Sequence, residues 1–189
     1  MQRISKKIEK EVPKQRKLQN TRRKGTTHIM SESTTKTNVM RQLDRAGISY
    51  TPMTYEVDEN NLAGTHIAEE IGLPGEIVFK TLAARGDKKG VCVFCIPAPA
   101  ELNLKEAARL TGDKKLELLP VKELQGLTGY IRGACSPIGM KKKFPTFIDA
   151  SCLEHEKITI SAGIRGIQLL LDPRALIAFV DAKTAALTL

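Results

Sequence analysis

Aromatic residues are rare in this sequence: there is no tryptophan, and aromatics make up 4% of its 189 residues. The core must therefore be aliphatic, and a hydrophobic content of 41% is enough to build one. The longest uncharged apolar stretch, residues 90–100, contains two prolines. It also falls short of the roughly 18 residues that a membrane-spanning helix needs. These features exclude a wholly disordered chain and a transmembrane protein.

Cysteine and histidine are also scarce, with four and three residues. Cys92 and Cys95 form a C-x-x-C, but on a strand an offset of three places the two side chains on opposite faces. Neither a shared metal ion nor a redox motif at a helix start fits this pattern. We therefore expect reduced thiols in a cytoplasmic protein that has no metal site and no cofactor.

The familiar catalytic signatures are missing. The sequence contains no G-x-S-x-G elbow, no Walker A loop and no G-x-G-x-x-G. A hydrolase with a standard serine nucleophile, a P-loop nucleotidase and a dinucleotide-binding enzyme are therefore not indicated.

Positive charge is present in excess but is unevenly spread. The formal net charge is +9, yet residues 1–35 hold ten Lys or Arg and three Glu, a net of +7. Residues 36–189 hold twenty basic and eighteen acidic residues, a net of +2. The basic character of the whole chain therefore describes mainly its first 35 residues.

Residues 1–35 have few apolar side chains, and we expect a disordered basic extension because too little surface can be buried. An arm that binds nucleic acid is one interpretation. An organelle-targeting peptide is a second, although Glu9 and Glu11 argue against it. In the third, the native protein begins at Met30. The extension alone carries no functional prediction.

Residues 36–189 show helical and strand patterns interspersed. We expect helices over residues 37–46, 65–71, 103–110, 120–127 and 173–180. We expect strands over 49–57 with a break at Pro52, and over 77–83, 91–96, 116–119, 144–150, 157–161 and 167–171. Hairpins are too frequent for a regularly alternating parallel sheet, so the prediction is a mixed α/β (α+β) domain.

Lys80 stands in the middle of an apolar strand, I-V-F-K-T-L (residues 77–82). If this strand is central in its sheet, the ammonium shares a face with Val78 and Leu82, and burying it is costly unless it is paired or functional. The alternative is a sheet edge from which the lysine reaches solvent. Spacing alone leaves both open.

A second unusual segment is rich in glycine: G-Y-I-R-G-A-C-S-P-I-G (residues 129–139), followed by M-K-K-K. Glycines let a backbone approach a ligand and present N–H groups to an oxyanion or a carbonyl. Ser136 adds a hydroxyl, and the lysines could meet phosphates. A structural turn with solvated charges is the alternative, and it stays open here.

Together these features resemble the YbaK family of aminoacyl-tRNA deacylases, which is related to the editing insertion domain of bacterial prolyl-tRNA synthetase. The resemblance spans about residues 37–187, and the combination of motifs is specific although each is weak alone. The motifs are F-K-T-L (79–82), L-N-L-K (102–105), T-G-Y (128–130), S-P-I-G (136–139), K-K (141–142), I-S-A-G (160–163) and R-G (165–166).

The resemblance implies a single domain, residues 36–189, with a curved mixed sheet flanked by helices. It implies an enzyme that hydrolyses the ester between a misattached amino acid and the 3′ end of tRNA, foremost Cys-tRNA(Pro). Such proteins act in trans on the acceptor end, and an association with prolyl-tRNA synthetase is a further expectation. Hydrolysis of an activated ester needs positioning and oxyanion stabilisation more than a protein nucleophile.

The resemblance also implies a site. Lys80 is its principal functional lysine, and the loop from Gly133 to Pro137 shapes the aminoacyl pocket. The substrate-binding residues that it implies are Tyr55, Thr81, Gly133, Ala134, Cys135, Ser136, Pro137, Ser161 and Gly163.

The sequence departs from the family pattern at three places. Ala134 replaces a common glycine, Ala175 stands where an acidic residue is common, and an aromatic residue is missing around residues 63–65. Amino-acid specificity is affected more than reaction class, so deacylation of Ala- or Ser-tRNA is an alternative. A non-catalytic module that binds tRNA or a synthetase is the rival from another class.

Overall fold

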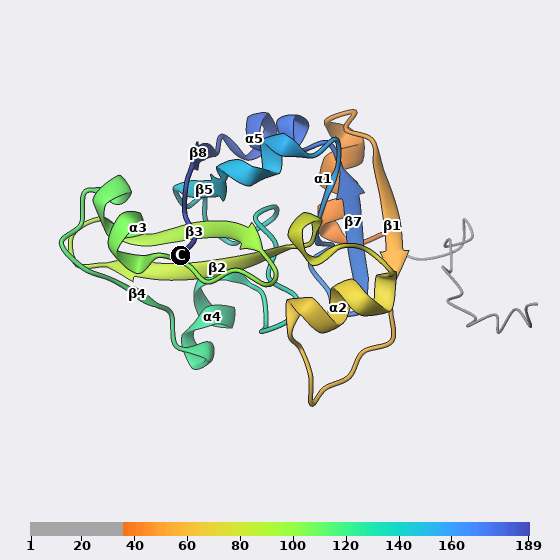
Figure 1. Ribbon diagram of the computed structural model, residues 1–189, viewed down its shortest axis with the longest axis horizontal. Coiled ribbons are helices and arrows are strands. Elements are labelled where there is room, and N and C mark those ends of the chain that lie inside the picture. The colour runs from red at the N-terminus through yellow and green to blue at the C-terminus, as the bar shows by residue number, and fades with distance from the viewer. Residues whose placement is uncertain (1–35) are drawn as a thin grey trace, which may run out of the picture.

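Two β-sheets and five α-helices make up the part of the chain that the structure, a computed structural model, describes: residues 36–189 (Figure 1). The extension predicted for residues 1–35 lies outside the described residues. An isolated parallel bridge between Val78 and Thr159 joins the two sheets. The mixed α/β class that the sequence predicted is confirmed.

The larger sheet has the strand order β4-β2-β3-β5-β8. Its centre is the predicted antiparallel hairpin of β2 and β3, beside which β4 runs antiparallel, while β5 and β8 run parallel to their neighbours. The strands are β2 (Phe79–Gly86), β3 (Gly90–Pro97), β4 (Leu116–Leu118), β5 (Thr146–Asp149) and β8 (Lys183–Ala185).

The smaller sheet is antiparallel and has the order β1-β7-β6. Its strands are β1 (Tyr50–Thr54), β6 (Ile158–Ser161) and β7 (Ile167–Leu171). The predicted break at Pro52 was wrong, because this proline lies inside β1 and pairs with Leu169. Since β1 is an edge strand, a proline there removes no hydrogen bond from the ladder.

All five predicted helices are present within one or two residues of their expected bounds. The side chains of Thr37, Asn103 and Asp172 accept main-chain N–H groups at three helix starts. In Figure 1, α4 lies on the opposite side of the β2–β3 hairpin from α5. The helices are α1 (Asn38–Arg45), α2 (Gly64–Ile71), α3 (Leu104–Thr111), α4 (Val121–Thr128) and α5 (Pro173–Val180).

Short elements account for the remaining differences. A 3₁₀ turn at Gly75–Ile77 delays the start of β2 to Phe79. A second, at Ala150–Glu154, follows β5 where the predicted strand continued to residue 150. Strand β8 was not predicted, because Lys183–Ala185 shows no apolar alternation.

The core consists of three clusters of buried side chains. Cys95 belongs to the cluster between the two sheets, whereas Cys92 belongs to the cluster beneath α3. Both thiols are buried and unpaired, so the prediction that the C-x-x-C points to opposite faces is confirmed. The stacked rings of Phe94 and Phe147, with centroids 5.3 Å apart, fill the second cluster.

Candidate active site

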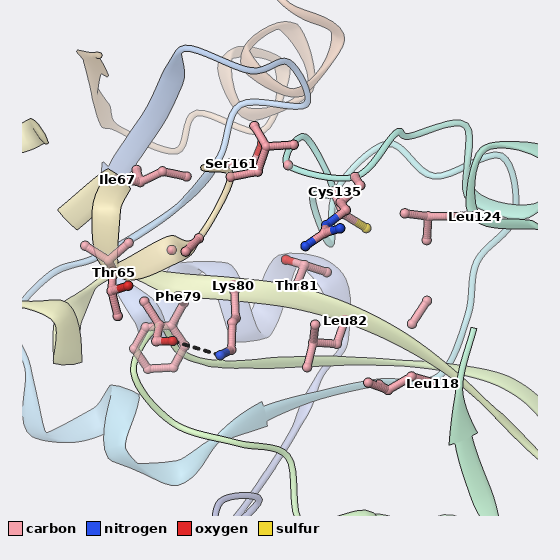
Figure 2. Close-up of a pocket in the computed structure, with 18 of the residues that line it drawn as sticks. Thr65, Ile67, Phe79, Lys80, Thr81, Leu82, Leu118, Leu124, Cys135 and Ser161 are labelled. Atoms are coloured by element: carbon pink, nitrogen blue, oxygen red, sulfur yellow. Dashed lines mark hydrogen bonds between the residues drawn. The ribbon is translucent and has the colours of Figure 1, made fainter. Parts of the chain in front are cut away.

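A cavity of about 450 Å³ lies along one edge of β2 (Figure 2). Strand β4 pairs with Ala84–Gly86, and the bridge at Val78 is the ladder pairing that links this part of the chain to β6. Between these two pairings, the segment from Phe79 to Leu82 is not paired with a strand on that side, although β6 packs nearby. The cavity occupies the gap, and residues from both faces of β2 line it.

Main-chain groups of Thr81 point toward this gap. The carbonyl of Ala83 accepts a 2.9 Å hydrogen bond from Leu119 N, so Ala83 faces the β4 side. In an antiparallel strand the direction of N–H and C=O alternates, and Thr81 therefore faces the same side as Ala83. There its N–H can donate to the oxygen of a bound group.

Lys80 lies half-buried at the cavity, and its ammonium donates a 2.8 Å hydrogen bond to the main-chain oxygen of Ala98 (Figure 2). Burial lowers the pKa of Lys80 below its ordinary value of 10.5, and the charge of Glu101 opposes this shift. Both interpretations of Lys80 are therefore correct in part. Strand β2 is an internal strand of its sheet, but on one side it has no paired strand at Lys80.

The glycine-rich segment 129–143 forms a loop fixed by hydrogen bonds. The Tyr130 hydroxyl donates to Ile138 O at 2.5 Å, and Tyr130 N donates to the Thr128 hydroxyl at 3.1 Å. Lys141 N closes the loop by donating to Thr128 O at 3.0 Å. The side of the loop that meets the cavity is therefore held in one arrangement.

Three residues of this loop, Arg132, Gly133 and Cys135, line the cavity. A Cβ atom on Gly133 would lie 3.3 Å from Arg165 Nε and 3.4 Å from the Leu62 side chain, so the wall is tightly packed there. Arg165 Nε also donates to Arg132 O at 2.9 Å. Burial raises the pKa of the Cys135 thiol to about 12, so it stays protonated at neutral pH and is a poor nucleophile.

The smaller sheet contributes two polar side chains to the cavity, Ser161 from β6 and Gln168 from β7. They are direct partners in the antiparallel register, so their side chains share one face of the sheet. The Ser161 hydroxyl accepts a 3.1 Å hydrogen bond from Gly163 N, which holds it at the end of the strand.

Half of the site residues that the resemblance implied come together around this cavity. These are Lys80, Thr81, Gly133, Cys135 and Ser161. They come from β2, the 129–143 loop and β6, three segments that are far apart in the sequence.

The remaining loop residues of that set lie outside the cavity lining. Ala134 is buried, and its N–H donates to Ile131 O within the loop. Ser136 is fully buried, and its hydroxyl accepts a 3.4 Å hydrogen bond from Ile138 N. Pro137 lines a second hollow of about 420 Å³ instead.

Tyr55 and Gly163 also stand back from the cavity. Tyr55 packs against the cluster of apolar residues around α2, and its N–H donates to Gly166 O at 3.0 Å. A Cβ atom on Gly163 would lie 3.0 Å from both Tyr130 Cε1 and Val39 Cγ2. Gly163 thus leaves room for the tyrosine that fixes the loop.

An apolar wall at the cavity was not predicted from the sequence. Leu118 on β4 is 49% exposed and Val121 on α4 is 60% exposed, and both line the cavity together with Leu124. Val121 and Leu124 are three residues apart, so they share a helix face. The spacing of these two residues can be read from the sequence, but the sequence does not show that this helix face lines a cavity.

No nucleophile–base pair is present among the cavity-lining residues of the described chain. They include no histidine, aspartate or glutamate. Within residues 36–189, no group of three or more His, Cys, Asp or Glu side chains could hold a metal ion. Nor does any helix of that region have the length and apolarity to cross a membrane.

The fold and the cavity together define a mixed α/β domain with a cavity at an unpaired edge of β2. Two cationic side chains, Lys80 and Arg132, line that cavity. Within that class, the chain belongs to the aminoacyl-tRNA editing domain family, whose sequence model matches residues 58–179. The match contains all the cavity-lining residues.

Individual relatives agree with this assignment. The chain is 40% identical over 153 residues to EbsC of Enterococcus faecalis, a candidate Cys-tRNA(Pro)/Cys-tRNA(Cys) deacylase, covering 81% of this chain and 93% of that protein. A solved candidate trans-editing enzyme for prolyl-tRNA synthetase has the same fold, with a TM-score of 0.69 and 22% identity over 82% of this chain and 99% of that one. Hypothetical protein APE2540 has it too, with a TM-score of 0.73 and 22% identity over 80% and 99%.

Proposed function

We propose that this protein is a trans-editing aminoacyl-tRNA deacylase that removes cysteine from mischarged tRNA(Pro). Membership of the editing-domain family supports the reaction class, and the name of the 40% identical relative supports the substrate. The observation that carries the proposal is the cavity at the open edge of β2, where Lys80, Arg132 and the main chain of Thr81 come together.

The chemistry of the cavity suits an ester that is already activated. The Cys135 thiol stays protonated, Ser136 is buried away from the cavity, and no histidine or carboxylate lines the cavity to activate the hydroxyls of Thr81 and Ser161, so an activated protein nucleophile is not at hand. Lys80 would stabilise the negative charge that develops on the ester carbonyl oxygen or hold the terminal nucleotide, and Thr81 N–H would assist.

Two routes fit these groups. In one, a water molecule attacks the ester carbonyl carbon and releases the amino acid and the free ribose hydroxyl of the tRNA. In the other, the thiol of the bound cysteine attacks its own ester carbonyl, releases the same hydroxyl, and leaves a cyclic thioester that water then opens. The second route would favour cysteine over alanine and serine.

The acceptor end of tRNA is the proposed partner, and prolyl-tRNA synthetase is proposed to deliver it in the cytoplasm. Local cations at the site matter more for this contact than overall charge, since residues 36–189 have a net charge of +2. Arg132 at the cavity and Lys142 at the second hollow would bind phosphates, and Lys143, which also pairs with Asp181 at 3.2 Å, would add to them.

A panel of mischarged tRNAs tests the proposal. Purified protein is incubated with Cys-, Ala- and Ser-tRNA(Pro), and loss of the aminoacyl ester is compared between the wild type and Lys80→Ala. We expect rapid loss of cysteine with the wild type and little with the variant. Binding of tRNA without hydrolysis of any ester would contradict the proposal and favour the rival, a non-catalytic tRNA-binding module.

A further inference from the structure

Gln168 occupies an unusual position for an amide side chain. It lies in β7, the middle strand of the smaller sheet, between Met53 on β1 and Ser161 on β6. Only 4% of the residue is exposed, and yet it lines the cavity. Its neighbours along the strand, Ile167 and Leu169, are buried apolar residues.

The side-chain oxygen of Gln168 is buried and has no hydrogen-bond partner within the described residues. Buried polar atoms are nearly always hydrogen-bonded, because leaving one unpaired costs free energy. Since the amide can turn about its last bond, its oxygen or its NH₂ group can meet a ligand that fills the cavity. Of the buried side-chain oxygens without a partner in the described residues, that of Gln168 is the one whose residue lines the cavity, so a ligand there could supply the missing partner.

The charges around the cavity decide which kind of group that ligand presents. Lys80 and Arg132 both line the cavity, and no carboxylate does. In Figure 2 the Lys80 side chain extends away from Ser161 and toward the carbonyl of Ala98. The part of the cavity at Lys80, its cationic end, thus repels positive groups, whereas Ser161 and Gln168 give their part, its uncharged end, side chains that carry no charge of their own and can accept hydrogen bonds.

In an aminoacyl ester the Cα atom carries two polar groups, the carbonyl group and the α-amino group, which require surroundings of opposite charge. Its carbonyl oxygen gains negative charge during hydrolysis and suits the cationic end. Its α-amino group is a donor and, when protonated, a cation, so it suits the uncharged end. We propose that Gln168, with Ser161 beside it, binds the α-amino group of the substrate; this inference rests on the proposed function.

The consequence is selection for a free α-amino group. Binding through Gln168 would fix the aminoacyl moiety in one orientation, with its carbonyl toward Lys80 and Thr81. An acylated amine is bulkier and has lost donors, so it would leave the glutamine unpaired. The protein would therefore discriminate against N-blocked aminoacyl-tRNA, whatever the side chain of the amino acid.

The test compares Cys-tRNA(Pro) with N-acetyl-Cys-tRNA(Pro) as substrates of the wild type and of Gln168→Met. We expect Gln168→Met to raise the KM for the free-amine substrate by roughly 10- to 100-fold, the range for a lost hydrogen bond to a charged group. Its effect on the acetylated substrate, which the wild type should already bind poorly, should be small. Gln168→Glu should lower the KM for the free-amine substrate alone.

Thr159→Val is a matched control. The Thr159 hydroxyl is also buried without a partner and lies on the same face two residues before Ser161, but it does not line the cavity. This variant should retain wild-type kinetics for both substrates, and thermal unfolding verifies that each variant is folded. If Gln168→Met does not fold, the Gln168→Glu comparison alone decides.

The possible failures are distinguishable. Wild-type hydrolysis of Cys-tRNA(Pro), with an unchanged ratio of KM values for free and acetylated substrates in both Gln168 variants, overturns this inference and leaves the proposed function standing. Absence of wild-type hydrolysis on every mischarged tRNA overturns the proposed function itself.

Discussion

The Tyr130 hydroxyl donates a 2.5 Å hydrogen bond to the main-chain oxygen of Ile138, eight residues further along the chain. Both residues are buried, and the bond spans the loop that carries Arg132, Gly133 and Cys135 to the cavity. Burial raises the pKa of Tyr130 to about 12, so the hydroxyl keeps its proton and remains a donor at physiological pH.

Removing that hydroxyl should loosen the loop. We expect Tyr130→Phe to lower the free energy of unfolding by about 1–3 kcal/mol, because Ile138 O loses a partner in a buried place. The same variant should lower kcat/KM for Cys-tRNA(Pro), since the loop residues lose their fixed positions. Urea denaturation and deacylation kinetics measure the two effects.

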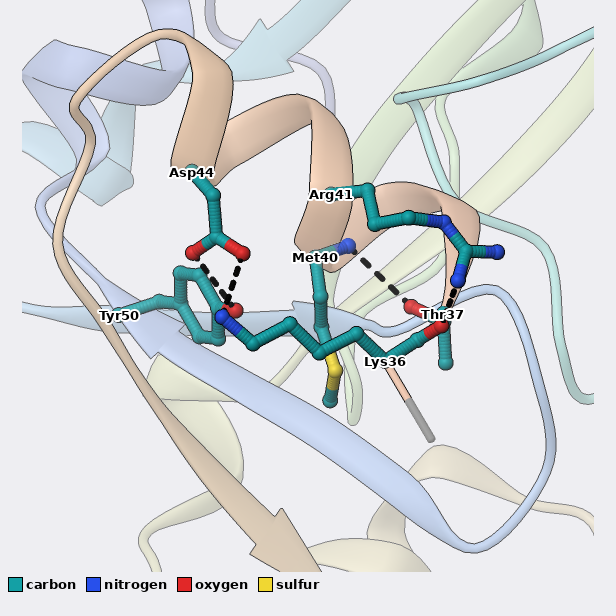
Figure 3. A network of polar contacts seen from close by, with 6 residues as sticks. All are labelled: Lys36, Thr37, Met40, Arg41, Asp44 and Tyr50. Carbon is teal, nitrogen blue, oxygen red and sulfur yellow. Dashed lines mark hydrogen bonds and ion pairs between the residues drawn. The ribbon is translucent and has the colours of Figure 1, made fainter. Parts of the chain in front are cut away.

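Tyr50→Phe is the matched control for this prediction. The Tyr50 hydroxyl donates to Asp44 at 3.1 Å in a network at the other end of the smaller sheet, which also contains the Lys36–Asp44 ion pair (Figure 3). Its loss should leave kcat/KM unchanged. Equal kinetic effects of the two variants would argue against a special role for the Tyr130 bond.

Replacement of Lys80 should separate activity from stability. We expect Lys80→Met to abolish deacylation while the thermal midpoint stays at or above that of the wild type, because the charge is held in a half-buried place that lowers its pKa. The exposed Lys105 offers a control, and Lys105→Met should be silent in both assays. A large drop in the thermal midpoint of Lys80→Met would instead indicate a structural lysine.

The lowered pKa of Lys80 also predicts how the reaction rate and the stability depend on pH. If charged Lys80 assists the reaction, the rate above the uncatalysed background should fall as the pH rises through its lowered pKa, at a midpoint below 10.5. Stability should show the opposite trend, because the unfolded state binds the proton more tightly. The cost of the charge is full below the folded-state pKa and disappears as the pH rises toward the unfolded value. Lys80→Met should remove both slopes.

Gly163→Ala should be destabilising. Gly163 has a φ of 86°, where a side chain is strained, and a Cβ atom would press on Tyr130 and Val39 at 3.0 Å. We expect a loss of about 1–3 kcal/mol in unfolding free energy and a lower kcat/KM. Gly47→Ala, at a φ of 68° but with nothing within 4 Å of the added atom, isolates the backbone part of this cost.

Deletion of residues 1–29 should spare deacylation. The residues that line the cavity all lie between Leu62 and Gln168, and the deleted segment contributes charge but none of these residues. Comparing kcat/KM of the full chain and the shortened one at two salt concentrations measures this. A large loss confined to low salt would reveal a contribution of the basic segment to tRNA encounter.

Most of the fold was predictable because local signals and the tertiary structure agree. Asn103 and Gly112 flank α3 as expected for a start and a stop, and Asp172 caps α5 ahead of a proline. The prediction failed where strand pairing, and not the local sequence, determines whether a strand forms. Strand β1 continues through Pro52 because it is an edge strand, and β8 forms because it pairs with β5.

The candidate site was predictable only in part. Lys80 attracted attention as a charge in an apolar strand, and the same signal, a polar residue in I-Q-L-L-L, marks Gln168, which was overlooked. The loop was found through its glycines. Which of its residues face the cavity depends on the bonds of Tyr130 and Thr128, and no spacing rule contains them.

The length of β4 carries a further consequence. The strand stops pairing at Ala84, and the cavity begins there. If β4 paired on to Thr81, the sheet would gain main-chain hydrogen bonds and the space for a substrate would close. A homologue with a longer β4 should be more stable and inactive, so the turn at Leu119 and Pro120 is a point where selection for stability and selection for catalysis act against each other.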